Sequence, residues 1–268
     1  MIGAPAGDIS GSRFEGNNYK KKDFRLFHKH CSFTDDTVMS LAVCEALMES
    51  GKDPAKLAQA AVVSMQRLSR LYPYAGYGGA FRRWIASENP EPYHSWGNGA
   101  AMRVSGCGYA ADTIEEAKLL ARIVTEVTHD HPESVKAAEA VASAVFMAKT
   151  GSSMDEIRTY ITENYYPVDF TLDEIRDTYS FDVSCQGSVP QAFEAFFEGK
   201  DFEDTIRNAG SIGGDSDTIA AIAGGMAEAY FGVPADIRKQ AESYLDETLL
   251  SILRRFEEKY PGKTVQEV

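Results

Sequence analysis

The sequence predicts an all-α protein of about ten or more helices, organised as a single domain over residues 1–268. Three observations support this fold class. Apolar residues recur at helical spacing through most of the chain. Many of these segments begin at a Ser, Thr or Asp that can cap a helix, or at a proline in the first turn. Extended alternation of polar and apolar residues, which marks a half-buried strand, is missing. Short strands near 104–109 or 181–185 are kept as an alternative for those two segments.

The composition fits a globular protein with an acidic surface. Hydrophobic residues make up 44% of the chain and charged residues 25%, which suffices for a sizeable core. The formal net charge of −13 argues against nucleic acid and anionic membranes as bulk partners, because both would repel the protein. A local phosphate site remains open, since backbone N–H groups bind anions without a basic surface.

The cysteines and the apolar segments bear on the compartment. Cys31, Cys44, Cys107 and Cys185 are widely spaced and form no C-x-x-C pair, which predicts free thiols in a reducing environment. The first residues lack the basic region and long apolar core of a secretory signal. Because no run of about 18 apolar residues occurs either, we expect no transmembrane helix and a cytoplasmic location.

The first predicted helix begins near Gly7. Gly11 follows one turn later, and the two glycines would let this helix pack closely on a neighbour, with Glu15 near its end. We expect Asp8 to cap or support the same helix, and a supporting position behind the ligands of a functional site is the alternative. The polar and basic residues 16–31 then predict a surface loop.

The next helix begins after a cluster of oxygen-bearing side chains. Apolar residues from Val38 to Met48 have helical spacing, so Thr34 is the natural N-cap, and Asp35 and Asp36 fall in the first turn. Acids in a first turn interact favourably with the helix dipole. That interpretation requires no ligand.

Asp53 and Pro54 predict the start of a third helix. Glycine and aromatic residues then crowd the connection 72–99, within which a short helix is expected near 79–87. Glycine-rich connections of this length are uncommon unless they are functional. The segment 95–103 is therefore either a loop whose backbone approaches a ligand closely or a tight turn between helices.

The remaining predicted helices share a cap or a proline near their start. Three residue pairs resemble capping boxes: Asp112 with Glu115, Ser153 with Glu156, and Thr171 with Glu174. The expected helices cover 112–128, 132–151, a segment from 153, a segment from 171, 189–199, 201–209, and a long last helix from Pro234 through Tyr260, before a frayed tail from Pro261.

The stretch Gly213-Gly214-Asp215-Ser216-Asp217-Thr218 precedes an apolar run that predicts a buried helix. The glycines allow a tight turn, and Asp215 can act as the N-cap. Capping explains one aspartate and gives no reason for Asp217. Because clusters of carboxylate and hydroxyl oxygens bind hard cations such as Mg²⁺ and Mn²⁺, a metal site is the second interpretation.

This stretch and Thr34-Asp35-Asp36 place the same kinds of side chain at the start of two apolar helices. If their four aspartates converge with Glu15, the five acids cannot all ionise unaided. Two like charges roughly 4 Å apart repel by about 4 kcal/mol at an effective dielectric constant near 20. Either some carboxyl groups stay protonated or cations fill the site. Two divalent ions would nearly neutralise five carboxylates, and the threonines Thr34 and Thr218 would add neutral oxygen ligands.

Five motifs occur in order along the chain: Gly7-Asp8-x-x-Gly11 with Glu15, Thr34-Asp35-Asp36-Thr37, Gly97-Asn98-Gly99-Ala100-x-Met102-Arg103, Thr128-His129, and Gly213-Gly214-Asp215-x-Asp217-Thr218-Ile219-Ala220. Together they resemble the ADP-ribosylglycohydrolase family, which includes the dinitrogenase-reductase-activating glycohydrolase and the ADP-ribosyl-acceptor hydrolases. The likeness spans residues 7 to about 232. Each motif is weak alone, whereas five in order are specific.

The resemblance implies an orthogonal multi-helix bundle with a central cleft that holds two divalent cations, Mg²⁺ or Mn²⁺. Thr34, Asp35 and Asp36 match one group of metal ligands, and Asp215, Asp217 and Thr218 match the other. Glu15 matches an acid at the metals or the scissile bond. The residues that match the ADP-ribose site are Ser95, Trp96, Gly97, Asn98 and Gly99 in one loop, His129, and the turn Gly213 and Gly214.

The implied reaction is hydrolysis of the glycosidic bond between ADP-ribose and a modified acceptor, with release of ADP-ribose. Glu15 or Asp36 would orient or deprotonate the attacking water. Two alternatives stay open: a two-metal hydrolase of a nucleotide or phosphate ester, and a member of the family that binds ADP-ribose without catalysis. The acceptor (arginine, serine, a nucleobase or a small molecule) and the oligomeric state are likewise open.

Overall fold

The computed structural model describes residues 1–262, and this part of the chain consists of helices and loops without a strand. The all-α prediction is therefore confirmed. Of the two candidate strands, residues 104–109 lie largely in helix α5 (Ser105–Ala110). The other candidate supplies only an isolated bridge between Gly97 and Ser184.

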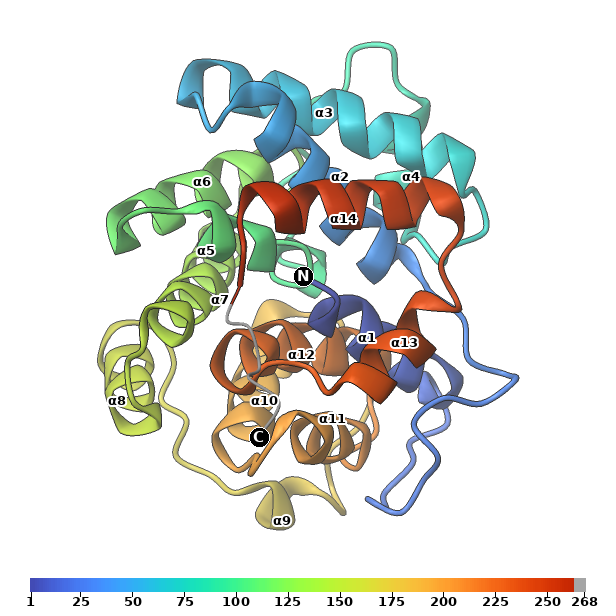
Figure 1. Ribbon diagram of the computed structural model, residues 1–268, viewed down its shortest axis with the longest axis vertical. Coiled ribbons are helices and arrows are strands. Elements are labelled where there is room, and N and C mark those ends of the chain that lie inside the picture. Colours follow the sequence, from blue (N-terminus) through green and yellow to red (C-terminus); the bar gives the residue numbers. More distant parts are fainter. Residues whose placement is uncertain (263–268) are drawn as a thin grey trace.

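Figure 1 shows helices that run in several directions around a packed interior, with α1 beside α12 near the middle of the molecule. The α-helices in residues 1–262 are α1 (Gly3–Gly11), α2 (Asp35–Ser50), α3 (Pro54–Leu71), α4 (Gly79–Ala86), α5 (Ser105–Ala110), α6 (Ile114–Glu126), α7 (Pro132–Thr150), α8 (Met154–Asn164), α9 (Leu172–Ile175), α10 (Cys185–Phe197), α11 (Phe202–Gly210), α12 (Ser216–Phe231), α13 (Ala235–Glu242) and α14 (Glu247–Lys259). Two 3₁₀ helices accompany them, η1 (Ser12–Phe14) and η2 (Asn98–Ala100).

Helices α1 and α12 approach each other closely because α1 presents glycines to α12. A Cβ atom on Gly7 would lie 1.9 Å from the Ala220 carbonyl oxygen, and one on Gly11 would lie 2.4 Å from the Ser216 carbonyl oxygen. The predicted close packing of the first helix is thus confirmed. The contact also fixes the position of α1 along the α12 axis, next to the first turn of α12.

Helix α12 is buried along almost its whole length, from Ser216 to Ala229. A helix that is apolar on all sides belongs in the centre of a protein rather than at its surface. Helix α7 is similar, with small alanines on most of its buried faces. Because these helices form the centre of the core, the residues at the start of α12 are held in a rigid interior position.

Most predicted helix starts are confirmed by side-chain caps. Thr34 accepts a hydrogen bond from the Asp36 N–H at the start of α2, and Asp53 accepts one from Ala55 at the start of α3. The two later capping boxes, at Ser153 and Thr171, are both present.

The predicted capping box at Asp112 was one residue out of register. Thr113 caps α6, and its hydroxyl accepts a hydrogen bond from the Glu116 N–H at 3.1 Å. The Glu116 carboxylate accepts the Asp112 N–H at 2.6 Å. Two overlapping candidate pairs stood in the sequence, and Thr113, with its extended backbone, takes the cap position.

Two other boundaries also differ from the prediction. Helix α10 begins at Cys185, before Val189, because Ser184 caps it through the Gly187 N–H. Pro190 therefore lies inside the helix. The long C-terminal helix is divided into α13 and α14, because Asp246 caps a new helix through the Leu249 N–H at 3.1 Å. The frayed tail predicted from Pro261 lies mostly outside the described residues.

The remaining sequence predictions at this level concern thiols and membranes. All four cysteines are buried free thiols, as predicted. Among the helices in residues 1–262, none combines the length and the hydropathy that a membrane crossing requires.

Candidate active site

A cleft of about 420 Å³ opens where the starts of α2 and α12 meet the loops around Gly76 and Gly97. Eleven of the residues predicted for the site line this cleft: Glu15, Asp35, Asp36, Ser95, Gly97, Asn98, Gly99, His129, Asp215, Asp217 and Thr218. Residues separated by up to two hundred positions in the chain therefore converge, as the metal-centre interpretation requires.

Four predicted residues lie beside the cleft and not in its lining. Thr34 lies behind the first turn of α2, where its hydroxyl donates to Asp8 Oδ1 at 2.8 Å. Trp96 is 58% exposed, next to the His131 ring. Gly213 and Gly214 have φ angles of +69° and +72° and form the turn into α12, packed against Asn18 and Tyr179.

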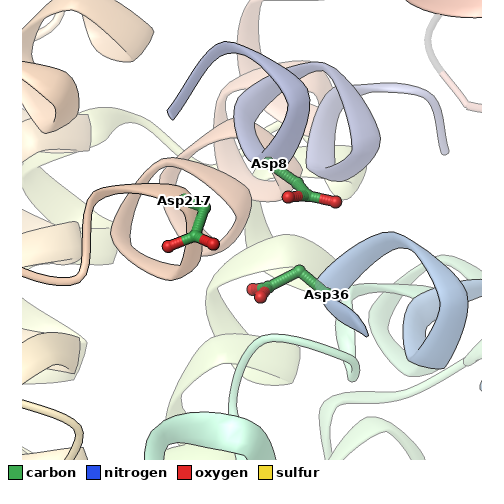
Figure 2. A group of neighbouring side chains, drawn as sticks. All are labelled: Asp8, Asp36 and Asp217. Carbon is green, nitrogen blue, oxygen red and sulfur yellow. The ribbon is translucent and has the colours of Figure 1, made fainter. Parts of the chain in front are cut away.

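The acids form two groups that share Asp217. In the first group, carboxylate oxygens of Asp8, Asp36 and Asp217 all lie within 4.8 Å of one another. In the second group, Glu15, Asp215 and Asp217 meet the same limit. Figure 2 shows the first group, whose side chains come from three separate helices and point toward one space. Each group is a candidate position for a cation, and the two candidates are adjacent because they share Asp217.

Asp8 supports the start of α2, which was the alternative role that the sequence left open for it. It was expected to cap or support its own helix, but its carboxylate serves the start of α2 instead. Oδ2 accepts hydrogen bonds from the Thr34 N–H at 2.8 Å, the Thr37 N–H at 3.1 Å and the Thr37 hydroxyl at 2.5 Å. Oδ1 accepts the Thr34 hydroxyl. Asp8 is fully buried. Because its carboxylate accepts all of these hydrogen bonds, it fixes the helix turn that carries Asp35 and Asp36.

Asp215 occupies the N-cap position of α12, but within the described chain its side chain makes no capping hydrogen bond. The Asn98 amide donates to Asp215 Oδ2 at 2.6 Å and to the Ser188 hydroxyl at 3.0 Å. Asn98 therefore holds the carboxylate in the cleft. The capping explanation for Asp215 is wrong for this geometry.

Thr218 joins the two helix starts, because its hydroxyl donates to Asp36 Oδ2 at 3.2 Å. On the other side, the Asp35 N–H donates to the Ala75 carbonyl at 2.7 Å, which ties α2 to the glycine loop. Gly76 has a φ angle of +109° and lies against Asp35, since a Cβ atom there would be 3.1 Å from Asp35 Oδ1. These contacts set the positions of the acids independently of any ligand.

Burial and mutual repulsion raise the pKa values of the clustered acids. Burial, followed by the charge of Asp217, raises the pKa of Asp36 well above its usual range. Burial, followed by the charge of Asp215, likewise raises the pKa of Asp217 well above its usual range. Burial and Asp8 raise the pKa of Asp35 to about 7. Burial, followed by Asp215, raises the pKa of Glu15. With no cation present, the cluster therefore retains protons at neutral pH.

The donor set fits divalent cations. Asp36 Oδ1 and Asp217 Oδ1 are buried and accept no hydrogen bond from any residue in 1–262. Buried carboxylate oxygens without a donor are costly unless a positive charge lies beside them. Both acids also lie in the first turn of a helix, where the dipole favours negative charge. All available ligands are oxygens, which Mg²⁺ and Mn²⁺ prefer.

The far side of the cleft is less charged. Tyr93, Phe81 and Arg103 join His129 there, together with glycines 76, 78 and 79. The Tyr93 and His129 rings meet edge to face, with centroids 5.4 Å apart. The dense glycine and aromatic content of 72–99 was the sequence signal for this wall, although it did not single out Tyr93 or Phe81.

An all-α fold with a buried carboxylate cluster beside a glycine-lined wall defines a class: helical hydrolases whose acids can hold divalent cations. Within that class, the chain belongs to the ADP-ribosylglycohydrolase family, whose sequence profile matches residues 1–264. The family prediction is therefore confirmed, and the chain is a hydrolase that acts on glycosidic bonds of ADP-ribose.

Individual relatives are distant. ADP-ribosylhydrolase ARH3 of Bos taurus is 26% identical over 82% of this chain and 76% of its own length. ADP-ribosylhydrolase ARH3 of Homo sapiens is 25% identical, with 82% of this chain and 77% of that protein covered. A solved structure described as an ADP-ribosylglycohydrolase-related protein complex is 25% identical, with a TM-score of 0.66, over 94% of this chain and 95% of that one.

Proposed function

We propose that the chain removes ADP-ribose from a modified acceptor, a protein side chain or a small molecule, with two divalent cations, Mg²⁺ or Mn²⁺, at the shared carboxylate cluster. The observation that carries the proposal is the pair of acidic groups joined at Asp217, which faces a cleft large enough for part of a nucleotide. Thr34, Asp35, Asp36, Asp215, Asp217 and Thr218 remain the proposed ligand set. Asp8, whose carboxylate accepts hydrogen bonds from Thr34 and Thr37, is proposed to hold the start of α2 in place behind them.

Bound cations would supply Lewis acidity and lower the pKa of a coordinated water. The side chains of the protein would hold the cations and position the water. Asp36 and Asp217 hold the negative charge, and Asn98 keeps Asp215 turned into the cleft. Glu15, at the exposed mouth of the cleft, would orient the attacking water or take its proton; its position beside Asp215 and Asp217 supports this role.

The ADP-ribose would extend away from the acids, along the wall of Ser95, Gly97, Gly99 and His129. Glycines allow the backbone to come close to a ligand, and backbone N–H groups can bind a diphosphate in a protein of net charge −13. Trp96 flanks this loop with an exposed ring. Gly213 and Gly214 would act indirectly, by shaping the turn that presents Asp215.

The test measures release of free ADP-ribose from ADP-ribosylated arginine and serine peptides by mass spectrometry. We expect turnover with Mg²⁺ or Mn²⁺, loss of turnover in EDTA, and recovery when the cation is restored. Asp217→Asn should lower turnover by at least a hundredfold, because Asp217 belongs to both groups. Glu258→Gln, which removes one exposed acid from α14, is the matched control and should behave as wild type.

Three results would contradict the proposal. Full turnover in EDTA or in Asp217→Asn would exclude the cation-dependent account. Inorganic phosphate or a nucleotide monophosphate as the product would instead indicate phosphoester hydrolysis. ADP-ribose binding without turnover on either peptide or on a small-molecule ADP-ribosyl conjugate would indicate a binding protein.

A further inference from the structure

A buried chain of polar groups lies behind His129. Arg103 Nη2 donates to the Thr128 hydroxyl oxygen at 2.6 Å, and that oxygen lies 2.7 Å from His129 Nδ1. All three side chains are buried, and Arg103 is only 1% exposed. Burial of a charged guanidinium costs free energy. The position of Arg103 against Thr128 therefore indicates a role other than packing.

The other nitrogen of the imidazole faces the cleft. A Cβ atom on Gly99 would lie 3.3 Å from His129 Nε2, and one on Gly97 would lie 3.6 Å from it. Both glycines line the cleft together with His129. Nδ1 is thus committed to Thr128, while Nε2 is directed to the space that a ligand would occupy.

The hydrogen-bond pattern determines where the imidazole proton lies. Arg103 can only donate, so the Thr128 oxygen accepts from it. The single Thr128 hydroxyl proton then has two acceptors, His129 Nδ1 at 2.7 Å and the Thr125 carbonyl at 3.3 Å. That carbonyl already accepts the backbone N–H groups of residues 128 and 129. A hydroxyl that accepts from a guanidinium is also polarised into a stronger donor.

We propose that Arg103 and Thr128 are positioning residues that hold His129 as the Nε2–H tautomer, so that it presents a neutral hydrogen-bond donor to an oxygen of the bound ligand. The identity of that ligand as ADP-ribose rests on the proposed function. The proton assignment does not, because it concerns the free protein. In addition, burial and then the Arg103 charge lower the pKa of His129 well below its usual range, which keeps the ring neutral at pH 7.

The first experiment observes the ring nitrogens directly. Long-range ¹H–¹⁵N spectra of the free, full-length protein at pH 7 distinguish protonated from unprotonated imidazole nitrogens, and His129→Gln identifies the His129 signals among the five histidines. We expect a protonated Nε2 and an unprotonated Nδ1. A proton on Nδ1, or on both nitrogens, would overturn the proposal whatever the substrate proves to be.

The second experiment measures ADP-ribose affinity by calorimetry. Thr128→Val should raise the Kd about tenfold, the loss of one neutral hydrogen bond. Thr128→Ser should restore it. Thr125→Val is the matched control, because the Thr125 hydroxyl is buried one turn earlier and has no partner within residues 1–262. His129→Gln, whose amide keeps a donor near the Nε2 position, should bind more tightly than His129→Ala.

A double-mutant cycle separates positioning from a general structural effect. If Thr128 acts through His129, Thr128→Val should weaken binding no further in a His129→Ala background. An equal tenfold loss in both backgrounds would overturn the positioning role. Absence of any ADP-ribose binding by wild type would contradict the proposed function, and the spectra would still test the tautomer.

Discussion

Single residues carry the chemistry of this cleft, and Asp8 shows how much one position can control. It does not line the cleft, yet it accepts hydrogen bonds from Thr34, the N-cap of α2, and from Thr37 in the first turn of that helix. The sequence placed Asp8 in a helix beside the site, without indicating which way its side chain points. Only the packing of α1 against α12 brings it to Thr34 and Thr37, and that contact lies between distant segments.

Replacing Asp8 tests this role. Asp8→Asn keeps the volume but removes one of the two carboxylate oxygens that accept from Thr34 and Thr37. Because residues that orient metal ligands typically contribute a factor of 10 to 100 in metal affinity, we expect the Mg²⁺ concentration for half-maximal activity to rise at least about tenfold. The measurement is a Mg²⁺ titration of turnover, with Glu258→Gln as the control. An unchanged Mg²⁺ requirement would argue against the role.

The raised pKa values predict how cation binding depends on pH. The pKa of Asp35 is raised to about 7 and that of Asp8 to about 6, with burial as the main cause. Between about pH 4 and pH 7 these groups bind more protons in the folded than in the unfolded protein. Their contribution to the stability of the metal-free protein is therefore full below about pH 4 and is lost as the pH rises to about 7.

Divalent cations should offset that loss, since they replace the protons. We expect saturating Mg²⁺ to raise the melting temperature more at about pH 8 than at about pH 5.5, where protons compete with the metal. Thermal unfolding in EDTA and in Mg²⁺ at both pH values measures this difference. An equal gain at the two pH values would contradict it, and Asp217→Asn should show a smaller gain at both.

At the scale of elements, the helices themselves were predictable and their boundaries less so. Local caps such as Thr34, Asp53 and Ser153 identified helix starts correctly, because capping depends on neighbouring residues alone. The division between α13 and α14 was missed. The cap that divides them, Asp246, is a local signal that the prediction overlooked. Its carboxylate also accepts the Tyr72 hydroxyl at 2.8 Å.

The contact between α1 and α12 lies next to the site. A bulkier residue in this contact should therefore lower the stability of the whole fold. Gly7→Ala would place a methyl group 1.9 Å from the Ala220 carbonyl. We expect urea titration to show that the free energy of unfolding falls by about 2 kcal/mol or more, because the backbone of α12 cannot move aside as a flexible side chain could. Gly79→Ala, at the open start of α4, should be neutral or slightly stabilising. Equal stability of the two variants would contradict this account of the interface.

Across the whole molecule, convergence of Glu15, Asp36 and Asp215 was a hypothesis that only the family resemblance of the motifs supported. The cleft brings these side chains together. The motifs could not separate residues that line the cleft from those that shape it. Gly213 and Trp96 lie outside the lining although their motif neighbours lie within it. That distinction depends on side-chain direction in the folded chain. The single-domain organisation stays a prediction.

We propose that the starts of α2 and α12, held in place by α1, bind two divalent cations. Crystals soaked in Mn²⁺ and measured at the manganese absorption edge test it most directly. We expect two anomalous peaks in the cleft, one bounded by Asp36 and Asp217 and one by Asp215 and Asp217, each about 2 Å from carboxylate oxygens. An empty cleft at saturating Mn²⁺, or peaks only elsewhere on the acidic surface, would contradict it.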